Sequence, residues 1–572
     1  MYTSSPTTHF TGSVEHPGDT VVSVTVNGIP ANLDGDDWSV DIPLDGNQIF
    51  NSVLVEADFE RGVSIKERRT VVYGDGNTAE VLPEGAVLNN GVGLRINESS
   101  FTKLGPTIKQ LTTIDPGAIA PSGTVVMDQC QKRVFGVCTV YVKAAISAPP
   151  SISDFNVGLD SQTGSVRALV NLYNFLLNLH VNARVLGVPV PCDLEITSDS
   201  IDVDGNYTLG PDPADPHLLD VNLVGTAPVV TLNGFGDDFV GGICSVPGIE
   251  QIVGLFVGDI QTMMRNNLTT MLGDPDGSGP VDSPVAEATE GALANIQIAG
   301  PIGDALGLNL ESAITAADVD DVGLGLRATA TFSANEVAPG APDLTGSVGF
   351  GDVLDPIGSV TPGGLGYDVA VGASVTGFNQ LLGAETERGL LNIDINELNG
   401  QPLTLKSLLD LIGAGGLVTV DAPVSIEMRP EVAPIITEAA GPGGSQAEFR
   451  LAGFRVTLKT TGPPAADVKL FKAVLDFRTG VSLNYVDGQL KFDLAVPAPA
   501  DFHATVTENL FGVPNEVVEG ALQSLTPQVF GAVQGQLPGF PLPSFVGMGL
   551  QPVEVGRVGA GLILYTNLVP GG

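Results

Sequence analysis

The sequence predicts a β-dominated α+β fold, and three observations point to it. The 572 residues include 72 Gly and 41 Pro, which is too many for a helical bundle and typical of short strands joined by turns. Long stretches alternate apolar and polar residues with period two, as half-buried strands do. A few other stretches repeat every three or four residues, which predicts helices packed on the sheets. The length predicts three or four domains.

The chain is strongly acidic and yet apolar. It has 25 Lys+Arg against 65 Asp+Glu, a net charge of −40, while only 16% of its residues are charged and 43% are hydrophobic. Nucleic-acid binding needs Lys and Arg to neutralise phosphates, so this balance argues against it. It argues equally against electrostatic docking on anionic lipid. A salt-adapted surface that maintains solubility is the simplest explanation of the acids.

The sequence contains no run of about 18 uncharged apolar residues, so no transmembrane helix is predicted. The first residues have no basic segment followed by an apolar one, so they do not predict a signal peptide. Residues 1–9 are instead expected to form a Ser/Thr/Pro-rich tether.

The four cysteines fall in two pairs, Cys130 with Cys138 and Cys192 with Cys244. An even number without metal-ligand spacing predicts disulfides and an oxidising compartment, and four buried thiols are the alternative.

Residues 10–75 are predicted to form a small β-sandwich. Val22, Val24 and Val26 alternate into Asn27-Gly28, which is a hairpin signal. The segment continues with Trp38 in DDWSVDIPLDGNQIF and then with VLVEADF. This pattern resembles the bacterial Ig-like repeats of surface proteins. The resemblance implies a spacer or docking domain that could bind a surface or matrix partner.

Residues 85–333 are predicted to contain a strand, a helix, a series of strands and a long helix. The first helix has an apolar face that includes Phe101 and Leu104. Strict alternation between Tyr173 and Val185 predicts a long half-buried strand with Phe175, Leu177 and Leu179 on one face. The spacing from Ile249 to Leu272 predicts a helix of about six turns. The stripe on this helix includes Ile252, Phe256, Ile260, Met263 and Met264. These side chains form either ordinary core or a pliable wall around a ligand.

The second part of the chain repeats this order. Residues 334–365 are rich in Pro and Gly and are expected to be a linker. Residues 366–572 then predict a strand, a helix with Phe378 and Leu382, further strands, a long helix after Pro514 and a final strand. The long helix presents Val518, Leu522, Leu525 and Phe530. The repeated order indicates a duplication, although the residues themselves do not repeat.

Three segments carry a resemblance to a known family: GVGLRINESSFTKLGPTIKQL at 91–111, LGYDVAVGASVTGFNQLLGAETERGLLNIDI at 365–395, and GFPLPSFVGMGLQPVEVGRVGAGLILY at 539–565. They resemble the bactericidal/permeability-increasing proteins and their lipopolysaccharide-binding and lipid-transfer relatives of the tubular lipid-binding superfamily. The resemblance implies a two-barrel boomerang in which each barrel is a highly curved antiparallel sheet wrapped on a long helix. A central sheet would join the barrels, with 334–365 crossing it and the C-terminal strand returning to it.

The resemblance also implies an apolar tunnel for acyl chains in each barrel. The residues expected to line the tunnels are Phe101, Leu104, Phe175, Leu177, Leu179, Ile252, Phe256, Ile260, Met263, Met264, Phe378, Leu382, Val518, Leu522, Leu525 and Phe530. The family disulfide ties a strand to the long helix, and Cys192–Cys244 matches it approximately. The bactericidal members have a Lys-rich tip, whereas the strand at 173–185 offers only Arg184. Endotoxin killing is therefore not carried over to this chain.

The expected function is to bind acyl chains and to sequester or transfer lipids at the bacterial envelope or outside the cell. Neutral or zwitterionic lipids are expected as partners because no charged clamp for a headgroup is evident. The expected location is secreted or on the cell surface or outer membrane, with a lipid anchor through the tether as one version and the periplasm as an alternative. A structural or adhesive surface protein with closed barrels is the alternative function.

No enzyme chemistry is predicted. The sequence contains neither a G-x-S-x-G elbow nor a G-x-x-x-x-G-K-[ST] phosphate loop. Its five His residues lack metal spacing, and the acidic turn that begins at Asp274 has Val285 where a calcium loop needs Glu. No cofactor or metal is expected, apart from a bound lipid or fatty acyl ligand.

Overall fold

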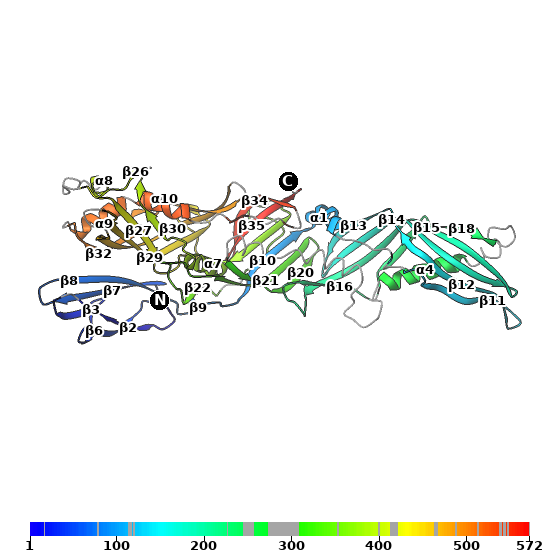
Figure 1. The fold of residues 1–572 in the computed structure, drawn as a ribbon, viewed down its shortest axis with the longest axis horizontal. Coiled ribbons are helices and arrows are strands. Elements are labelled where there is room, and N and C mark those ends of the chain that lie inside the picture. Colours follow the sequence, from blue (N-terminus) through cyan, green and yellow to red (C-terminus); the bar gives the residue numbers. More distant parts are fainter. Residues whose placement is uncertain are drawn as a thin grey trace.

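The protein is an elongated molecule in which two halves lie end to end and a small N-terminal unit lies beside the second half (Figure 1). Strands make up 60% of the structure and helices 14%, which confirms a β-dominated fold. The structure is a computed structural model that describes residues 1–15, 18–76, 79–111, 117, 121–225, 227–243, 257–272, 308–351, 354–398, 401–411, 421–462, 467–486, 489–511, 514–524, 526–536, 540–541, 545 and 548–570.

The N-terminal unit consists of two small sheets around one apolar core. One sheet has the order β1-β8-β7-β3-β4 and the other β2-β6-β5. Side chains from both sheets meet in the core, among them Val26, Trp38 and Val53. The strands are β1 (Tyr2–Thr3), β2 (Thr7–Ser13), β3 (Val21–Val26), β4 (Ile29–Pro30), β5 (Asn32–Asp34), β6 (Asp37–Pro43), β7 (Phe50–Phe59) and β8 (Ser64–Tyr73).

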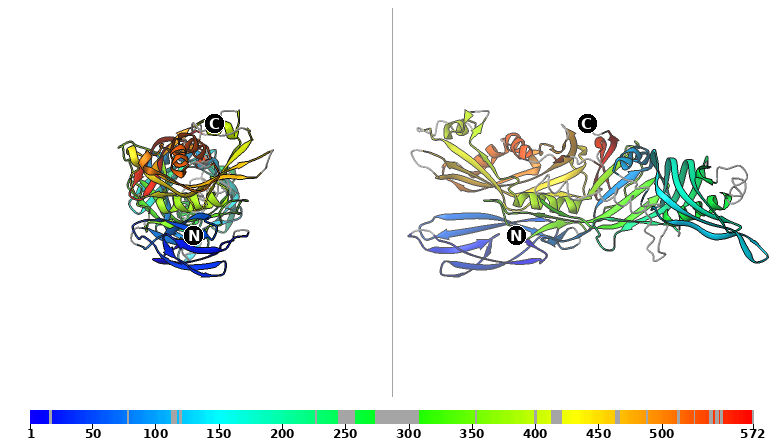
Figure 2. Two further views of the ribbon diagram at one scale, coloured as in Figure 1. Left: turned by 90° about the vertical axis from the view of Figure 1, so that its left-hand side faces the viewer. Right: turned by 45° about the vertical axis from the view of Figure 1, so that its right-hand side comes forward.

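The expected tether at residues 1–9 is wrong, because these residues belong to the sheets. β1 pairs in parallel with β8, and β2 pairs with β6 along its length. The unit is also not a free spacer, since it packs along the second half (Figure 2). The backbone N–H of Thr70 donates to Glu431 at 3.1 Å, and the N–H of Ala433 donates to the Tyr2 hydroxyl at 3.2 Å. Gly453, at φ 67°, allows this close approach, because a Cβ there would lie 2.5 Å from Thr70 Oγ1.

The first half is built on a curled antiparallel sheet of very long strands. Its order is β11-β12-β14-β15-β16, with β13 on β14 and both β17 and β18 on β15. β14 has 21 residues and β15 has 24, far above the usual strand length of about 5–6, and such long twisted strands curl into a half-barrel. The strands are β11 (Val125–Val134), β12 (Val137–Ser151), β13 (Asp154–Gln162), β14 (Ser165–Val185), β15 (Val188–Pro211), β16 (Leu219–Leu223), β17 (Val229–Asn233) and β18 (Gly236–Gly242).

The long strand predicted around 173–185 is confirmed within β14, which contains an irregularity that the alternation did not predict. Buried side chains occupy even positions up to Leu172 and odd positions from Phe175. Asn174 lies between them at φ 50°, a left-handed conformation that Asn tolerates. This one residue shifts the phase, so both parts of the strand present their apolar side chains to the same core.

Two helices of the first half contact this sheet. α1 (Glu98–Leu111) follows directly after β10 (Leu88–Asn97), as the sequence predicted. α4 (Val257–Leu272) covers the second part of the helix expected from 249 to 272, and residues 249–256 lie outside the described part of the chain. Leu268 of α4 is buried against the strands.

A central antiparallel sheet joins the halves. β10 pairs with β21 on one side and with β23 on the other, and β23 pairs with β35. The final two strands of the chain thus return to the centre of the molecule. The remaining strands of this sheet and of the small β9–β22 pair are β9 (Glu80–Pro83), β19 (Leu308–Glu311), β20 (Ile314–Asp320), β21 (Gly323–Ala334), β22 (Gly346–Gly349), β23 (Val369–Ser374), β34 (Gly549–Val558) and β35 (Gly561–Val569).

The segment 334–365 is not a loose linker. β22 pairs with β9, and Leu344, Val348, Leu354 and Ile357 are buried. The segment therefore packs on the molecule through these side chains and through the pairing of β22 with β9.

The second half is built on another curled sheet with the order β24-β27-β29-β30-β31-β33, with β28 on β29 and β32 on β30. α7 (Val375–Glu387) begins directly after β23, and the Ser374 hydroxyl caps it by accepting from the Gly377 N–H at 3.0 Å. The other elements are β24 (Ile393–Ile395), β25 (Glu397–Leu398), β26 (Gln401–Pro402), α8 (Leu405–Leu411), β27 (Val424–Pro430), β28 (Ile435–Thr437), η4 (Pro442–Gly444), β29 (Ala447–Thr460), β30 (Lys469–Val486), β31 (Gln489–Leu494), η5 (Pro499–Asp501), β32 (Phe502–Asn509) and β33 (Phe540–Pro541).

The long helix expected after Pro514 is wrong, because two shorter helices occupy its place. They are α9 (Asn515–Ser524) and α10 (Thr526–Gln536). Leu525, between the two helices, lies outside the described residues. Pro527 lies in the first turn of α10, where its missing N–H is harmless.

Candidate functional site

The predicted interior residues of the first half lie together. Phe101 and Leu104 from α1 and Phe175, Leu177 and Leu179 from β14 are all at most 4% exposed and belong to one apolar cluster. The apolar face of the first predicted helix and the apolar face of the long predicted strand thus meet in one core, as expected.

Helix α4 contributes to this cluster. Met263 packs against it while partly buried, and Leu268, which was not among the predicted residues, is 2% exposed. The other described side chains of α4 are exposed or half-buried. Only the backbone is described at Ile260 and Met264, whereas Ile252 and Phe256 lie outside the described residues.

The second half has its own apolar cluster, which brings together Leu382, Val518, Leu522 and Phe530, with Phe378 packed against it. Leu525 lies outside the described residues. Phe477 of β30 contacts Phe530 with a ring-centroid distance of 4.7 Å. The prediction did not include a set of aromatic residues on the strands. They are Phe449, Phe454, Phe471, Phe477, Phe492 and Phe502. Even spacing relates Phe471 to Phe477 on β30, whereas a register shift in β29 separates Phe449 from Phe454.

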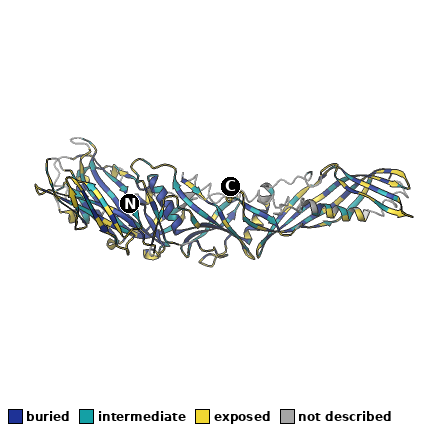
Figure 3. Ribbon diagram, turned by 90° about the horizontal axis from the view of Figure 1, so that it is seen from below, coloured by how far each residue is buried: buried dark blue, intermediate teal, exposed yellow. Residues whose placement is uncertain are grey.

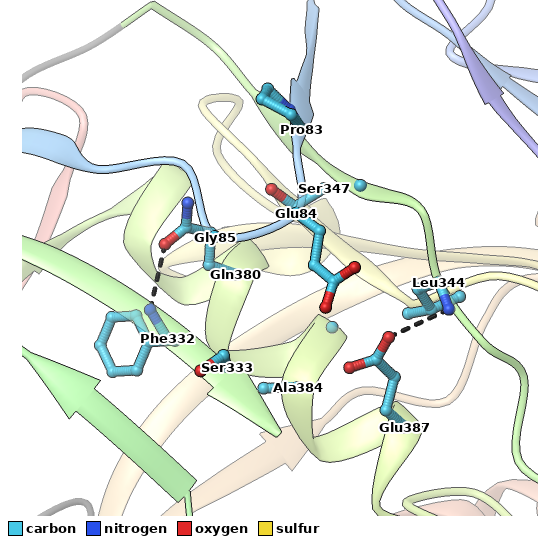
Figure 4. Close-up of a pocket in the computed structure, with 12 residues that line it drawn as sticks. Pro83, Glu84, Gly85, Phe332, Ser333, Leu344, Ser347, Gln380, Ala384 and Glu387 are labelled. Atoms are coloured by element: carbon cyan, nitrogen blue, oxygen red, sulfur yellow. Dashed lines mark hydrogen bonds between the residues drawn. The ribbon is translucent and has the colours of Figure 1, made fainter. Parts of the chain in front are cut away.

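A small cavity lies where α7 meets the strands that enter the central sheet (Figure 4). Gln380 accepts a hydrogen bond from the Phe332 N–H at 3.3 Å, and Glu387 accepts one from the Leu344 N–H at 3.0 Å. Burial raises the pKa of the Glu387 carboxyl, and the nearby Glu84 raises it further. The cavity of about 30 Å³ has room for one or two water molecules and not for an acyl chain.

The distal end of the first half carries two unusual hairpin turns. Phe135-Gly136 joins β11 to β12 and Leu186-Gly187 joins β14 to β15, each with both residues at positive φ. Such type I′ turns favour Asn-Gly or Asp-Gly, and a bulky residue at positive φ is rare. Phe135 is nevertheless 102% exposed and Leu186 77% exposed. The turns are neighbours, because Val140 of β12 pairs with Val185 of β14. We call this region the distal tip, and Figure 3 shows it as exposed.

Basic side chains gather at the distal tip. Residues 129–153 and 174–192 contain Lys132, Arg133, Lys143 and Arg184 and no Asp or Glu, and Asp128, just outside them, lies 3.7 Å from the Lys143 ammonium. A hollow of about 660 Å³ between the two turns is lined by Tyr141, Lys143, Asn182 and Arg184, among others. The pairing of β12 with β14 places Lys143 opposite Asn182 and Tyr141 opposite Arg184, so basic residues distant in the sequence share this end of the sheet.

The predicted disulfide between Cys130 and Cys138 is confirmed, and it cross-links β11 to β12 close to the Phe135-Gly136 turn. A disulfide fits an extracellular or envelope protein. Cys244 lies outside the described residues, so its pairing with Cys192 stays a prediction.

Within the described ranges, no cluster of three or more His, Cys, Asp or Glu side chains could hold a metal ion. None of the described helices is both long enough and apolar enough to cross a membrane.

Comparison with known proteins gave only distant structural matches. No known protein-family profile matches the sequence, and no curated protein matches it. The chain is similar over 85% of its length to the whole of a lipopolysaccharide-binding protein, with a TM-score of 0.40 and 14% identity. It is similar over 85% of its length to the whole of P47 of Clostridium botulinum E1, with a TM-score of 0.29 and 10% identity.

Proposed function

We propose that this protein binds lipid: its distal tip docks on a lipid surface, and the apolar interiors of its half-barrels accept acyl chains. The single observation that carries the proposal is the pair of apolar turns at the tip. Phe135 and Leu186 occupy positions where the backbone favours Asn, and they are fully or largely exposed. Neither folding nor solubility explains this choice, whereas insertion into a lipid surface does. Val137 and Val188, at 66% and 61% exposure, extend the apolar surface.

The charges of the tip support the same partner. Lys132, Arg133, Lys143 and Arg184 surround the turns, so phosphate-bearing headgroups would meet cations while the turns insert. The net charge of −40 does not prevent this, because at physiological salt charges more than about 8 Å away are largely screened. The preferred lipids are thus anionic or zwitterionic phospholipids, which revises the neutral or zwitterionic preference expected from the sequence.

The interior of the first half supports the proposed binding of acyl chains. Its wall is aliphatic and aromatic, and Met263 and Leu268 of α4 pack against it. Each CH₂ moved from water into the interior contributes about 0.8 kcal/mol, so a sixteen-carbon chain contributes on the order of 10 kcal/mol before ordering costs. The proposal includes no catalytic step and no cofactor.

Liposome flotation of the full chain tests the docking step. The double variant Phe135→Asn/Leu186→Asn should reduce binding to phosphatidylcholine/phosphatidylglycerol vesicles at least tenfold, because each buried apolar side chain contributes about 1.5–3 kcal/mol. Its Tm should be unchanged or higher, since Asn suits the left-handed backbone. Leu510→Asn is the matched control, because Leu510 is 68% exposed in the second half. Unchanged vesicle binding by the double variant would contradict the docking step.

Uptake of a fluorescent fatty acyl probe tests the interior separately. Met263→Asp places a carboxylate on the inner side of α4 and should abolish uptake while vesicle binding through the tip persists. If the variant takes up the probe as the wild type does, the first half does not hold acyl chains near α4.

A further inference from the structure

A second site lies far from the distal tip, in a cleft between the N-terminal unit and the second half. The cleft has a volume of about 420 Å³, which lies within the range of small-molecule pockets. β7 and β8 of the N-terminal unit form one wall, and β29, β30 and the residues around the start of β32 form the other. Its lining is dominated by polar and charged side chains, unlike the interiors of the half-barrels.

Three arginines converge on this cleft, in a chain that has only 25 Lys+Arg. Arg68 comes from β8, Arg450 from β29 and Arg478 from β30. Arg450 and Arg478 are direct cross-strand partners, an arrangement in which like charges destabilise a sheet. Asp476 and Asp501 line the cleft with the three arginines, and Glu448 pairs with Arg450 beside it.

Arg68 is the central donor. Its side chain is only 6% exposed. Nε donates to the Ser52 hydroxyl at 2.6 Å, and one terminal nitrogen donates to Asp476. The other terminal nitrogen, Nη1, is buried without a hydrogen-bond partner in the described part of the chain. A buried donor without a partner is destabilising, which indicates that a group absent from the protein itself completes this site.

The other two arginines have donors to spare as well. Arg450 contacts Glu448 and Arg478 contacts Asp501, in each case through Nε. The terminal nitrogens of both forks are thus left for a ligand, as far as the described residues show. The contact with Asp501 raises the pKa of Arg478, so its guanidinium stays charged. Glu448 and Asp501 therefore orient the two guanidinium groups without occupying their terminal N–H donors.

We propose that this cleft binds a small molecule that carries an oxyanion, either a phosphate or a carboxylate. A guanidinium fork matches the planar pair of oxygens of such a group and forms charge-assisted hydrogen bonds with it. Asn47, Gln48 and His503 also line the cleft and supply hydrogen-bonding groups for the remainder of the molecule. The oxyanion relieves the repulsion between Arg450 and Arg478. This site does not depend on the lipid-binding proposal.

Isothermal titration of the full chain with inorganic phosphate and, separately, with citrate tests the proposal. We expect saturable binding of at least one probe at physiological salt, with at least tenfold weaker binding by Arg478→Gln and by Arg450→Gln. These two side chains are 57% and 35% exposed and do not hold the N-terminal unit in place, so both variants should keep the Tm of the wild type. Arg429→Gln is the matched control, because Arg429 is also paired with a carboxylate but does not line the cleft.

Each outcome of this titration decides the question. Binding of phosphate alone assigns the site to phosphate-bearing molecules, and binding of citrate alone assigns it to carboxylates. If neither probe binds the wild type, or if both cleft variants bind as tightly as the wild type does, the cleft is not an oxyanion site. Weakening by Arg429→Gln to the same extent would also overturn the assignment.

Discussion

Three hairpin turns of this chain have the same backbone conformation but different residues at their first position. The Phe and Leu of the distal tip are therefore not required by the backbone. Asn27-Gly28, Phe135-Gly136 and Leu186-Gly187 have nearly the same left-handed geometry, with φ values of 50°, 51° and 51° at their first residues. The N-terminal unit uses the favoured Asn, while the tip uses Phe and Leu. The Asn-Gly turn was predictable because the pair is a known signal. The tip was not, because only the cross-strand register reveals that Phe135 and Leu186 share one end of the molecule.

Glu387 is a residue whose environment only the structure defines. It lies at 7% exposure at the end of α7, beside Glu84. Burial raises its pKa above the usual 4.5. The folded state therefore binds a proton at pH values where the unfolded chain has already lost it, and this favours folding at low pH. The contribution is lost as pH rises through the window above 4.5.

Glu387→Gln should consequently stabilise the second half at neutral pH. The amide oxygen still accepts from the Leu344 N–H, and no charge needs to be buried. We expect Tm to rise by about 2–4 °C at pH 7.5, which is the shift that about 1 kcal/mol produces in a domain of 150–250 residues. Calorimetry at pH 4 should show a much smaller difference. An equal gain at both pH values would mean that ionisation of Glu387 is not the cause.

Among the elements, α7 connects more of the second half than its length suggests. The Asn379 side chain, 1% exposed, donates to the carbonyls of Val348 and Ile436 at 3.1 Å and accepts from the Ile436 N–H at 2.7 Å. One amide thus satisfies backbone groups of both β22 and β28. These strands are at the edges of their sheets, so α7 supplies the pairing that they lack.

Asn379→Ala should destabilise the protein by about 2–4 kcal/mol, because it leaves buried backbone groups without partners. Chemical denaturation followed by intrinsic fluorescence or circular dichroism measures the change. Asn484→Ala is the control, since Asn484 is an exposed residue that donates to Asp493, and it should change stability by less than about 0.5 kcal/mol. A loss at Asn379 no greater than at Asn484 would show that α7 does not tie these strands together.

Periodicity predicted which elements exist better than it predicted where they break. The helical spacing of Val518, Leu522 and Phe530 continues across the boundary between α9 and α10, so the apolar pattern did not predict two helices. In β14 the apolar alternation predicted a regular strand, whereas Asn174 shifts its phase. At Asn174 the local backbone conformation overrides a pattern that depends on side chains.

At the scale of the whole molecule, the N-terminal unit is held on the second half by ion pairs that contain partly buried carboxylates. Glu431, at 10% side-chain exposure, accepts from the Thr70 N–H and pairs with Arg455 and Arg69. Asp476 pairs with the buried Arg68. These contacts keep the unit alongside the half-barrel, and the Arg68–Asp476 pair spans the oxyanion cleft.

Glu431→Ala should release the N-terminal unit from the second half, because it leaves Arg455, Arg69 and the Thr70 N–H without their shared partner. Small-angle X-ray scattering should show a larger radius of gyration, and hydrogen exchange should increase along β8. Asp41→Ala removes an exposed pair with His9 and serves as the control, with no change in either measurement. Retention of the wild-type scattering profile would mean that the Arg68–Asp476 pair and the remaining contacts hold the unit without Glu431.

By itself, the sequence determined the secondary structure and the polarity of this protein. It predicted the β-dominated composition, the strand-to-helix order of both halves, the interior faces around Phe101, Leu177 and Leu382, and the Cys130–Cys138 disulfide, because periodicity and spacing are local properties. Tertiary structure decided where distant segments meet. It placed the first residues in a sheet, packed 334–365 onto the molecule, docked the N-terminal unit, and gathered basic residues into the tip and the cleft. These features arise from strand register and side-chain packing between segments up to 431 residues apart, as Tyr2 and Ala433 are, and no local pattern encodes such pairings.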